Sequence, residues 1–386
     1  MRRITSRRAL GRTPTSALLL AASCTVSAAI GVGGGGAQPA PSGLGTWDPA
    51  AAAAYLDQRM AWWMNWPNAA RDHDTACISC HTSLPYALAR PALRGPLGEA
   101  GPTMHEETLV SGVERRVTLW NEVEPYYPDQ TVGLPKTSES RGTEAVLNAL
   151  ILVGRDGQSA EPSERTRKAL ANLWALQFTR REGTGAWAWL HFGLAPWESD
   201  GAEYFGAALA AIAVGSASGD YAEREAPQDR LDLLRAYLLD DWRSRPVFDR
   251  VMLAWASAEL SGLLTLEETG AVAAELGTLQ NTDGGWSLSS LRAWPREDGS
   301  AQDLSSDGYA TGLVAFVLQR AAASRSDPGL NRALQWLIEH QDPAGGGWST
   351  ASLNKDRDPK SDRGRFMSDA ATAFAVLALA EADRVR

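Results

Sequence analysis

The stretch LQWLIEHQDPAGGGW, residues Leu334–Trp348, joins an amphipathic helical pattern to a glutamine, a glycine-rich turn and a tryptophan. Two earlier stretches repeat this order: LWALQFTRREGTGAW (Leu173–Trp187) and LGTLQNTDGGW (Leu276–Trp286). Repetition of one pattern along a chain is typical of folds built from a recurring supersecondary unit. We therefore expect the chain from about Ser138 onward to consist of repeated helical units.

A second class of segment alternates with the first and is rich in alanine and leucine. Its four examples begin with a small or acidic polar residue, at Ser140, Ser199, Ser306 and Ser368. Serine and aspartate cap the free N–H groups at the start of a helix, and small residues allow helices to pack closely or lie buried. Amphipathic outer helices that alternate with buried inner ones predict an all-α fold, an α/α toroid of two concentric rings.

The glutamine–glycine–tryptophan segments resemble the QW repeats of the squalene-hopene cyclase and prenyltransferase superfamily. The residues that carry this resemblance are Gln177 and Trp187, Gln280 and Trp286, and Gln341 and Trp348. The resemblance implies a toroid in which each pair ties the end of an outer helix to the next turn. It implies no reaction, since the chain lacks the Asp-x-Asp-Asp motif of the cyclases, a Cys-Gly-Glu-Gln thioester string, and any cysteine after Cys80 for a prenyltransferase zinc site.

Three aspartates precede helices of the inner class and should lie near one rim: Asp200, Asp307 and Asp369. A buried acid in an aromatic-lined cavity has a raised pKa and can donate a proton, so these are candidate catalytic residues. The alternative is that they cap helices. Four tryptophans either line an apolar cavity for an isoprenoid-like ligand or pack in the core: Trp189, Trp197, Trp255 and Trp294.

The segment 46–135 precedes the repeats and contains the run DHDTACISCHTSL at positions 72–84. Its Cys77-x-x-Cys80-His81 motif fits covalent haem c. Each thiol can add to one vinyl group, and the adjacent histidine then lies beneath the iron as its axial ligand. The alternatives are a Cys77–Cys80 disulfide, or a zinc site that takes a fourth ligand from elsewhere in the segment.

The same segment resembles a minimal class I cytochrome c, with Gly95–Leu97 in the place of the Gly-Pro-x-Leu run behind the haem histidine. Under this resemblance Met104 is the expected distal iron ligand. Met64, His73 and His105 are rivals, and either histidine could also supply the fourth ligand of a zinc site.

Residues 1–45 predict an export signal and a flexible tether. Five arginines precede an apolar run at Ser16–Gly31 that is too short for a confident membrane span, and glycine, proline and alanine follow it. We expect an exported protein, periplasmic or otherwise extracytoplasmic. The signal could be plain, of the twin-arginine type at Arg7-Arg8, or a lipoprotein signal at Cys24.

Charge and hydropathy exclude two classes of partner for the remaining chain. Beyond residue 45 there are 32 basic and 46 acidic residues, a formal net charge of −14. A chain this acidic, with no basic stripe, is a poor nucleic-acid binder. No later segment is long and apolar enough to predict a transmembrane span.

The sequence thus predicts three parts: a signal and tether (1–45), a cytochrome c-like haem segment (46–135) and a toroid (136–386). The leading functional hypothesis is electron transfer through haem c, with a redox partner protein or a quinone-like donor and the toroid as a scaffold. One alternative is a terpenoid cyclase-like or haem-dependent enzyme acting on an isoprenoid-like substrate. The other is a non-catalytic binding module with a Cys77–Cys80 disulfide.

Overall fold

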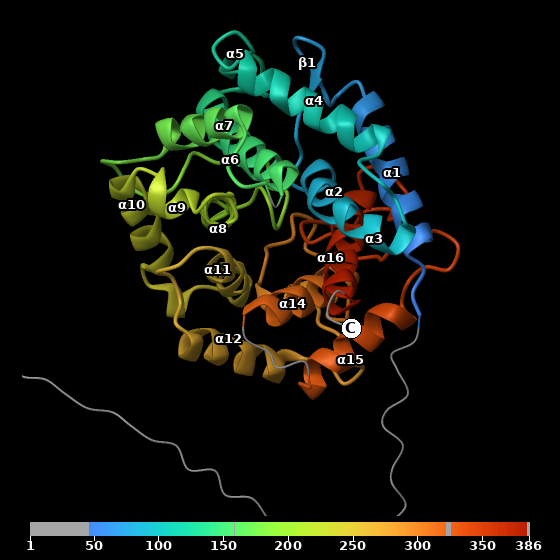
Figure 1. The fold of residues 1–386 in the computed structure, drawn as a ribbon. Coiled ribbons are helices and arrows are strands. Elements are labelled where there is room, and N and C mark those ends of the chain that lie inside the picture. Colours follow the sequence, from blue (N-terminus) through green and yellow to red (C-terminus); the bar gives the residue numbers. More distant parts are fainter. Residues whose placement is uncertain (1–45, 158, 322–325, 384–386) are drawn as a thin grey trace, which may run out of the picture. The chain divides into compact units, whose positions relative to one another are not determined.

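Helices of two classes alternate along the chain in the computed structural model, which describes residues 46–157, 159–321 and 326–383 (Figure 1). The outer helices are α1 (Pro49–Asn65), α4 (Met104–Thr118), α7 (Glu164–Leu176), α10 (Gln228–Leu239), α12 (Leu266–Leu279) and α15 (Pro328–Glu339). The inner helices are α2 (Ser83–Ala89), α6 (Lys136–Asp156), α8 (Glu203–Gly215), α11 (Val247–Glu259), α14 (Gly308–Ala321) and α16 (Arg365–Asp383).

Short elements fill the connections between these helices. They are β1 (Ala70–Arg71), β2 (Thr75–Ala76), α3 (Arg94–Leu97), α5 (Asp129–Val132), α9 (Tyr221–Arg224), α13 (Leu288–Leu291) and the 3-10 turns Arg90–Leu93 and Trp242–Ser244. The two strands pair antiparallel, with Ala70 opposite Ala76. In the part of the chain that the structure describes, they form the only sheet.

The inner helices form a closed ring. Each packs against the next in the order α2, α6, α8, α11, α14 and α16, and α16 returns to pack against α2. Small residues allow the closest of these approaches. A Cβ atom on Gly312 of α14 would lie 2.5 Å from the backbone nitrogen of Ala375 on α16, so only glycine fits there. The all-α toroid expected from the sequence is confirmed.

The three glutamines of the repeated motif hold each outer helix to the next. The amide of Gln177 donates to the carbonyls of Gly185 and Arg230 at 3.0 Å, and that of Gln280 donates to the carbonyls of Gly284 and Gly329 at 2.8 Å. One acceptor lies in the glutamine's own glycine turn, and the other lies in the first turn of the next outer helix. Each glutamine therefore fixes the step from one unit to the next.

The third glutamine closes the ring. Gln341 donates to the carbonyls of Gly346 and Asp48 at 2.8 Å and accepts from the Asp48 N–H at 2.8 Å. Asp48 is the N-cap of α1, so this contact joins the last outer helix to the first. Gly346 lies directly against α1 and adopts a φ of +75°. A Cβ atom at this position would lie 2.3 Å from the Ala51 carbonyl oxygen, so the position requires glycine.

The tryptophans of the motif anchor the turns to the preceding outer helices. Their indole N–H groups donate to backbone carbonyls as follows: Trp187 to Leu173 (2.7 Å), Trp286 to Leu276 (2.8 Å) and Trp348 to Leu337 (2.7 Å). All three rings are buried. The Gln and Trp side chains are therefore structural in this chain.

Residues 46–135 do not form a cytochrome c-like haem segment, and that expectation is wrong. They supply two outer helices, α1 and α4, and the inner helix α2, which closes the ring between α16 and α6. The described residues from 46 onward belong to one compact unit. The prediction of a functional boundary near residue 135 stays a prediction.

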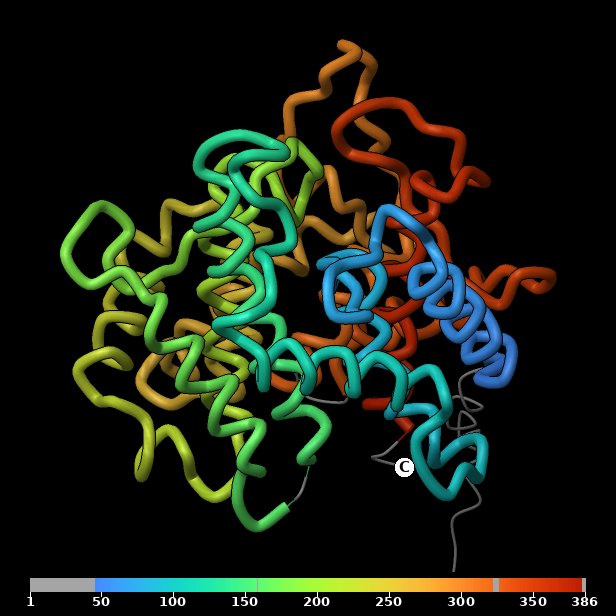
Figure 2. The backbone as a smooth tube through the Cα atoms, turned by 90° about the horizontal axis from the view of Figure 1, so that it is seen from above, coloured from blue at the N-terminus to red at the C-terminus, as the bar shows by residue number. Residues whose placement is uncertain are grey.

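Five of the six connections into the inner helices are long, and they gather at one rim; the sixth, 240–246 before α11, is short. The long connections run over 66–82, 119–135, 177–202, 280–307 and 340–364. Figure 2 shows the loops around residues 300 and 355 side by side at this edge, where the Glu297 N–H donates to the Asn354 carbonyl at 2.8 Å. Long loops held by a rigid scaffold are where binding and catalytic groups concentrate.

The signal, tether and Cys24 predictions lie outside the described residues. Within the described ranges, no helix has the length and hydropathy needed to cross a membrane.

Candidate functional site

A cavity of about 350 Å³ opens at the rim where the long connections meet. It lies between the end of α1, the cysteine-containing connection 66–82, the connections 119–135 and 177–202, and the loop that leads into α16. We call it the rim pocket. Its walls combine aromatic rings with one carboxyl group and two arginines.

Aromatic side chains in two separate pairs line the rim pocket. The ring centroids of Trp66 and Phe366 lie 6.4 Å apart, and those of Tyr127 and Phe192 lie 4.9 Å apart. Phe192 is exposed at 41%, unusually high for a large apolar side chain. Exposed aromatic rings beside a concave site mark a binding surface rather than a part of the core.

Glu198 is the only carboxylate that lines the rim pocket among the described residues. The backbones of Leu194 and Glu198 pair across a tight loop, and the glutamate is only 8% exposed. Burial raises its pKa to about 7; Lys136 opposes the shift and Glu139 adds to it. Near neutral pH this carboxyl group exists in both protonation states, so it can donate or accept a proton.

Two arginines approach the rim pocket from the loop before α16. Arg363 is exposed, and Arg357 is half-buried. The Nε atom of Arg357 is buried without a hydrogen-bond partner. An unsatisfied buried donor costs about 1–3 kcal/mol, so this atom is better satisfied when a ligand supplies an acceptor.

His81 also lines the rim pocket, as a neutral ring. Burial lowers its pKa to about 3, with Arg59 adding to the effect. Its Nδ1 lies 2.9 Å from the Thr82 hydroxyl, which donates to Asp369 at 2.6 Å. Because the Thr82 hydroxyl donates its hydrogen to Asp369, it accepts a hydrogen bond from Nδ1–H of His81. The neutral ring therefore carries its proton on Nδ1, and Nε2 is free to accept a hydrogen bond. Phe366 stacks on the ring at 3.7 Å.

The two cysteines are reduced and buried in this structure. Burial raises the pKa of Cys77 to about 12 and also raises that of Cys80. Both are therefore thiols at neutral pH, and the structure holds no disulfide between them. Cys77 lines the rim pocket, whereas Cys80 does not. Covalent haem at this motif stays a prediction.

The structure separates Met104 from His81. Met104 begins α4, is 74% exposed and is absent from the lining of the rim pocket. Among the described residues, no group of three or more His, Cys, Asp or Glu side chains is placed to hold a metal ion.

The three predicted aspartates lie in three different environments. Asp369 is buried and receives two hydrogen bonds from Arg59, at 2.7 and 3.0 Å. Asp307 accepts from the backbone N–H groups of Tyr309 and Ala310 at 3.0 and 2.9 Å, as a helix cap does, and burial raises its pKa to about 6.

Asp200 is the third, and its side chain is 94% exposed. It pairs with His191 at 2.7 Å beside a cavity of about 150 Å³. None of the three aspartates lines the rim pocket.

The four tryptophans proposed for an apolar cavity are all buried. Trp197 stacks on Tyr309, which stacks on Phe374, and Trp255 meets Phe374 edge-on. These rings fill the middle of the toroid. Trp294 borders the cavity beside Asp200.

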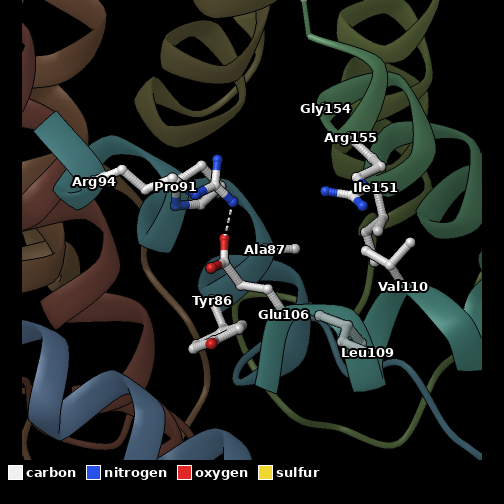
Figure 3. Close-up of a pocket in the computed structure, with 10 residues that line it drawn as sticks. All are labelled: Tyr86, Ala87, Pro91, Arg94, Glu106, Leu109, Val110, Ile151, Gly154 and Arg155. Atoms are coloured by element: carbon white, nitrogen blue, oxygen red, sulfur yellow. Dashed lines mark hydrogen bonds and ion pairs between the residues drawn. The ribbon is translucent and has the colours of Figure 1, made fainter. Parts of the chain in front are cut away.

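A smaller cavity of about 50 Å³ lies at the opposite ends of the inner helices (Figure 3). Figure 3 shows the ion pair of Arg94 and Glu106 on one side and Ile151 and Arg155 of α6 on the other. This volume holds only one or two water molecules, so it is too small for an organic ligand.

Comparisons with known proteins bear on the fold. No protein-family model and no curated protein sequence matches this chain. The structure is similar to an unsaturated glucuronyl hydrolase from Bacillus sp. GL1, responsible for the degradation of glycosaminoglycan. The identity is 11%, the match covers 85% of this chain and 94% of that one, and the TM-score is 0.50. A polysaccharide lyase aligns over 89% of this chain and 91% of its own, at 13% identity and a TM-score of 0.36.

These findings correct the sequence-based assignment. A solved structure similar to this toroid is a glycosaminoglycan-degrading hydrolase and not a squalene-hopene cyclase, and the assignment to the squalene-hopene cyclase and prenyltransferase superfamily is wrong. The cytochrome c resemblance is also wrong, because its segment is part of the ring. The predicted function, haem electron transfer with a terpenoid cyclase-like scaffold, rested on these two resemblances and is also wrong.

Glu198, Arg357 and Arg363 were not among the residues predicted from the sequence. They lie in connections of irregular sequence, far apart along the chain. The one local signal was a glutamate directly after a tryptophan, in the run WESD at positions 197–200, and that signal is weak.

Proposed function

We propose that this chain is a glycoside hydrolase that acts on an oligosaccharide containing a uronic acid, and that the reaction takes place in the rim pocket. The observation that carries the proposal is Glu198, a nearly buried carboxyl group that faces a cavity lined by aromatic rings and two arginines. The shared toroid with a glucuronyl hydrolase supports this choice of substrate class.

The aromatic walls suit a sugar ring. A pyranose presents flat C–H faces and a polar edge, and it packs between rings in the way that other apolar faces do. The pair Trp66 and Phe366 and the pair Tyr127 and Phe192 offer two such surfaces. The volume of about 350 Å³ is sufficient for one to two monosaccharide units.

The arginines suit the carboxylate of the sugar. Guanidinium groups bind carboxylates through two parallel, charge-assisted hydrogen bonds. Arg363 is exposed, and the Nε of Arg357 has no hydrogen-bond partner among the described residues. A neutral sugar offers these guanidinium groups no carboxylate, so we expect a preference for acidic substrates.

Glu198 then acts as the proton-transferring residue. Its carboxyl group donates a proton to the glycosidic oxygen as the bond to the anomeric carbon breaks. A water molecule adds to that carbon, and its proton returns to the Glu198 carboxylate. The pKa of about 7 keeps the acid form populated at neutral pH. Most glycoside hydrolases use two carboxylates, but here a single carboxylate lines the pocket among the described residues.

The test is an activity screen of the purified protein with uronate-containing disaccharides, both saturated and with a C4–C5 double bond. Hydrolysis releases a reducing end. Loss of the ultraviolet absorbance of the double bond would identify the unsaturated sugar as the substrate. A gain of that absorbance from a saturated substrate would show elimination and contradict a hydrolase.

The matched variants are Glu198→Gln and Glu122→Gln, of which the second changes an exposed glutamate outside the pocket. The first should lower kcat by about 100- to 10,000-fold, as loss of a general acid does, and the second should leave it unchanged. Equal activity of the two variants would remove Glu198 from the mechanism, and no cleavage of any acidic or neutral glycan would refute the function.

A further inference from the structure

A larger cavity, of about 480 Å³, lies on the same rim beside the first. Three segments form it: the connection 296–303, the turn 349–352 and the loop 356–364. We call it the second cavity. It contains no aromatic side chain, which sets it apart from the rim pocket.

The two cavities share one wall. Arg357 lines both, and Arg363 of the rim pocket is followed directly by Gly364 of the second cavity. The buried, unpartnered Nε of Arg357 therefore belongs to a side chain that stands between them. A ligand long enough to pass this arginine would occupy both cavities.

Polar side chains line the second cavity, and hydrogen bonds within the chain fix their positions. Arg296 donates to the Ser352 carbonyl and to the Ser300 hydroxyl, both at 2.6 Å. Thr350 donates to Asp307 at 3.0 Å. Fixed hydroxyl and backbone groups of this kind suit hydrogen bonds to the hydroxyls of a sugar, because little side-chain entropy remains to be lost on binding.

The charges of the two cavities differ. The rim pocket has Arg357 and Arg363 against one carboxyl group. The second cavity has Asp303 and Asp356 against Arg296 and the shared Arg357, so its charges balance. A carboxylate is therefore attracted to the rim pocket, and a neutral unit to the second cavity.

We propose that the second cavity is a separate subsite for a neutral, hydroxyl-rich sugar, and that the substrate is a glycan in which this unit is linked to the uronic acid held in the rim pocket. The inference rests on the proposed function for the identity of the first unit. Arg357 lies between the two units and can contact both.

The test uses a substitution that fills the second cavity and leaves the residues of the rim pocket unchanged. Ala351 is exposed and lines the second cavity, so Ala351→Trp places a large ring in it. The control is Ala274→Trp, the same substitution at an exposed position on the outer helix α12. Circular dichroism and thermal unfolding would establish that both variants are folded.

Two probes separate the subsites. One is an unsaturated uronate–N-acetylhexosamine disaccharide, which is long enough for both cavities. The other is methyl β-D-glucuronide, whose uronate fits the rim pocket and whose methyl group is too small to reach the second cavity. We expect Ala351→Trp to raise the Kd and KM of the disaccharide at least about tenfold and to leave the glucuronide unaffected, since only the second unit is displaced. Ala274→Trp should change neither.

The outcomes distinguish the two proposals. An unchanged disaccharide Kd in Ala351→Trp, or an equal loss for both probes, overturns the second subsite while leaving the hydrolase proposal standing. Disaccharide binding that Ala351→Trp weakens, without cleavage by the wild type, refutes the hydrolase and supports the subsite. Absence of both binding and cleavage in the wild type overturns both.

Discussion

Replacing Glu198 by glutamine should stabilise the protein at alkaline pH while it removes activity. Burial raises the pKa of this carboxyl group from 4.5 to about 7, and the difference corresponds to about 3 kcal/mol between its two protonation states. Between those two pH values the unfolded chain has released the proton and the folded chain retains it. The unfolded state then binds fewer protons, so the free energy of unfolding falls as pH rises through this window.

Glutamine keeps the shape of the side chain but carries no titrating proton. Relative to the wild type, we therefore expect Glu198→Gln to gain about 3 kcal/mol of unfolding free energy at pH 8 and less than about 1 kcal/mol at pH 5. Urea unfolding at both pH values, with Glu122→Gln alongside, measures this difference. The same shift at pH 5 and pH 8, or no larger shift than in Glu122→Gln, would refute the burial argument.

The same group sets a pH limit on catalysis. Since Glu198 must be protonated to donate, kcat should be highest below pH 7 and fall as pH rises through about 7. A profile that rises through that range would instead identify Glu198 as a base.

Three further predictions test other parts of the molecule. Asp369→Asn leaves the buried guanidinium of Arg59 without its carboxylate and should cost about 3–5 kcal/mol in urea unfolding; Asp200→Asn, on an exposed side chain, should stay within about 0.5 kcal/mol. Gln341→Ala removes hydrogen bonds that close the ring and should cost about 1–3 kcal/mol, with increased hydrogen exchange in the first turn of α1 as the specific sign. Arg363→Ala should raise the KM for an acidic disaccharide about tenfold without changing that for its neutral counterpart, because the lost contact is charge-assisted; an equal change for both would exclude a carboxylate partner.

Much of the architecture follows from local patterns. The repeated order of amphipathic helix, glutamine, glycine turn and tryptophan predicts the toroid, since each feature acts within one unit and its neighbour. The hydrogen bonds of Gln177, Gln280 and Gln341 have the geometry that this order requires. The helix cap at Asp307 can also be predicted from the sequence, because a cap accepts hydrogen bonds from backbone N–H groups two or three positions ahead.

Prediction from local patterns was wrong where the role of a motif depends on the distant residues that pack around it. Cys77-x-x-Cys80-His81 is a short motif, and by itself it predicts a separate haem segment. In the fold this run lies between α1 and α2, inside the ring that those helices complete. A three-residue motif cannot show which distant helices pack on it.

The sequence by itself thus determined the fold class and the alternation of inner and outer helices, because these depend on spacings within a few turns of chain. The structural role of the glutamine and tryptophan pairs was implied only by the family resemblance, and the bonds from each glutamine to the next outer helix span about 50 residues or more. Only the tertiary structure decided that residues 46–135 complete the ring, that Met104 and His81 lie apart, and that Glu198 shares a pocket with Arg357 and Arg363. Ring closure brings loops together that are more than 150 residues apart in the chain. The raised pKa of Glu198 arises from that closure, since burial is a property of the assembled rim and not of the residue.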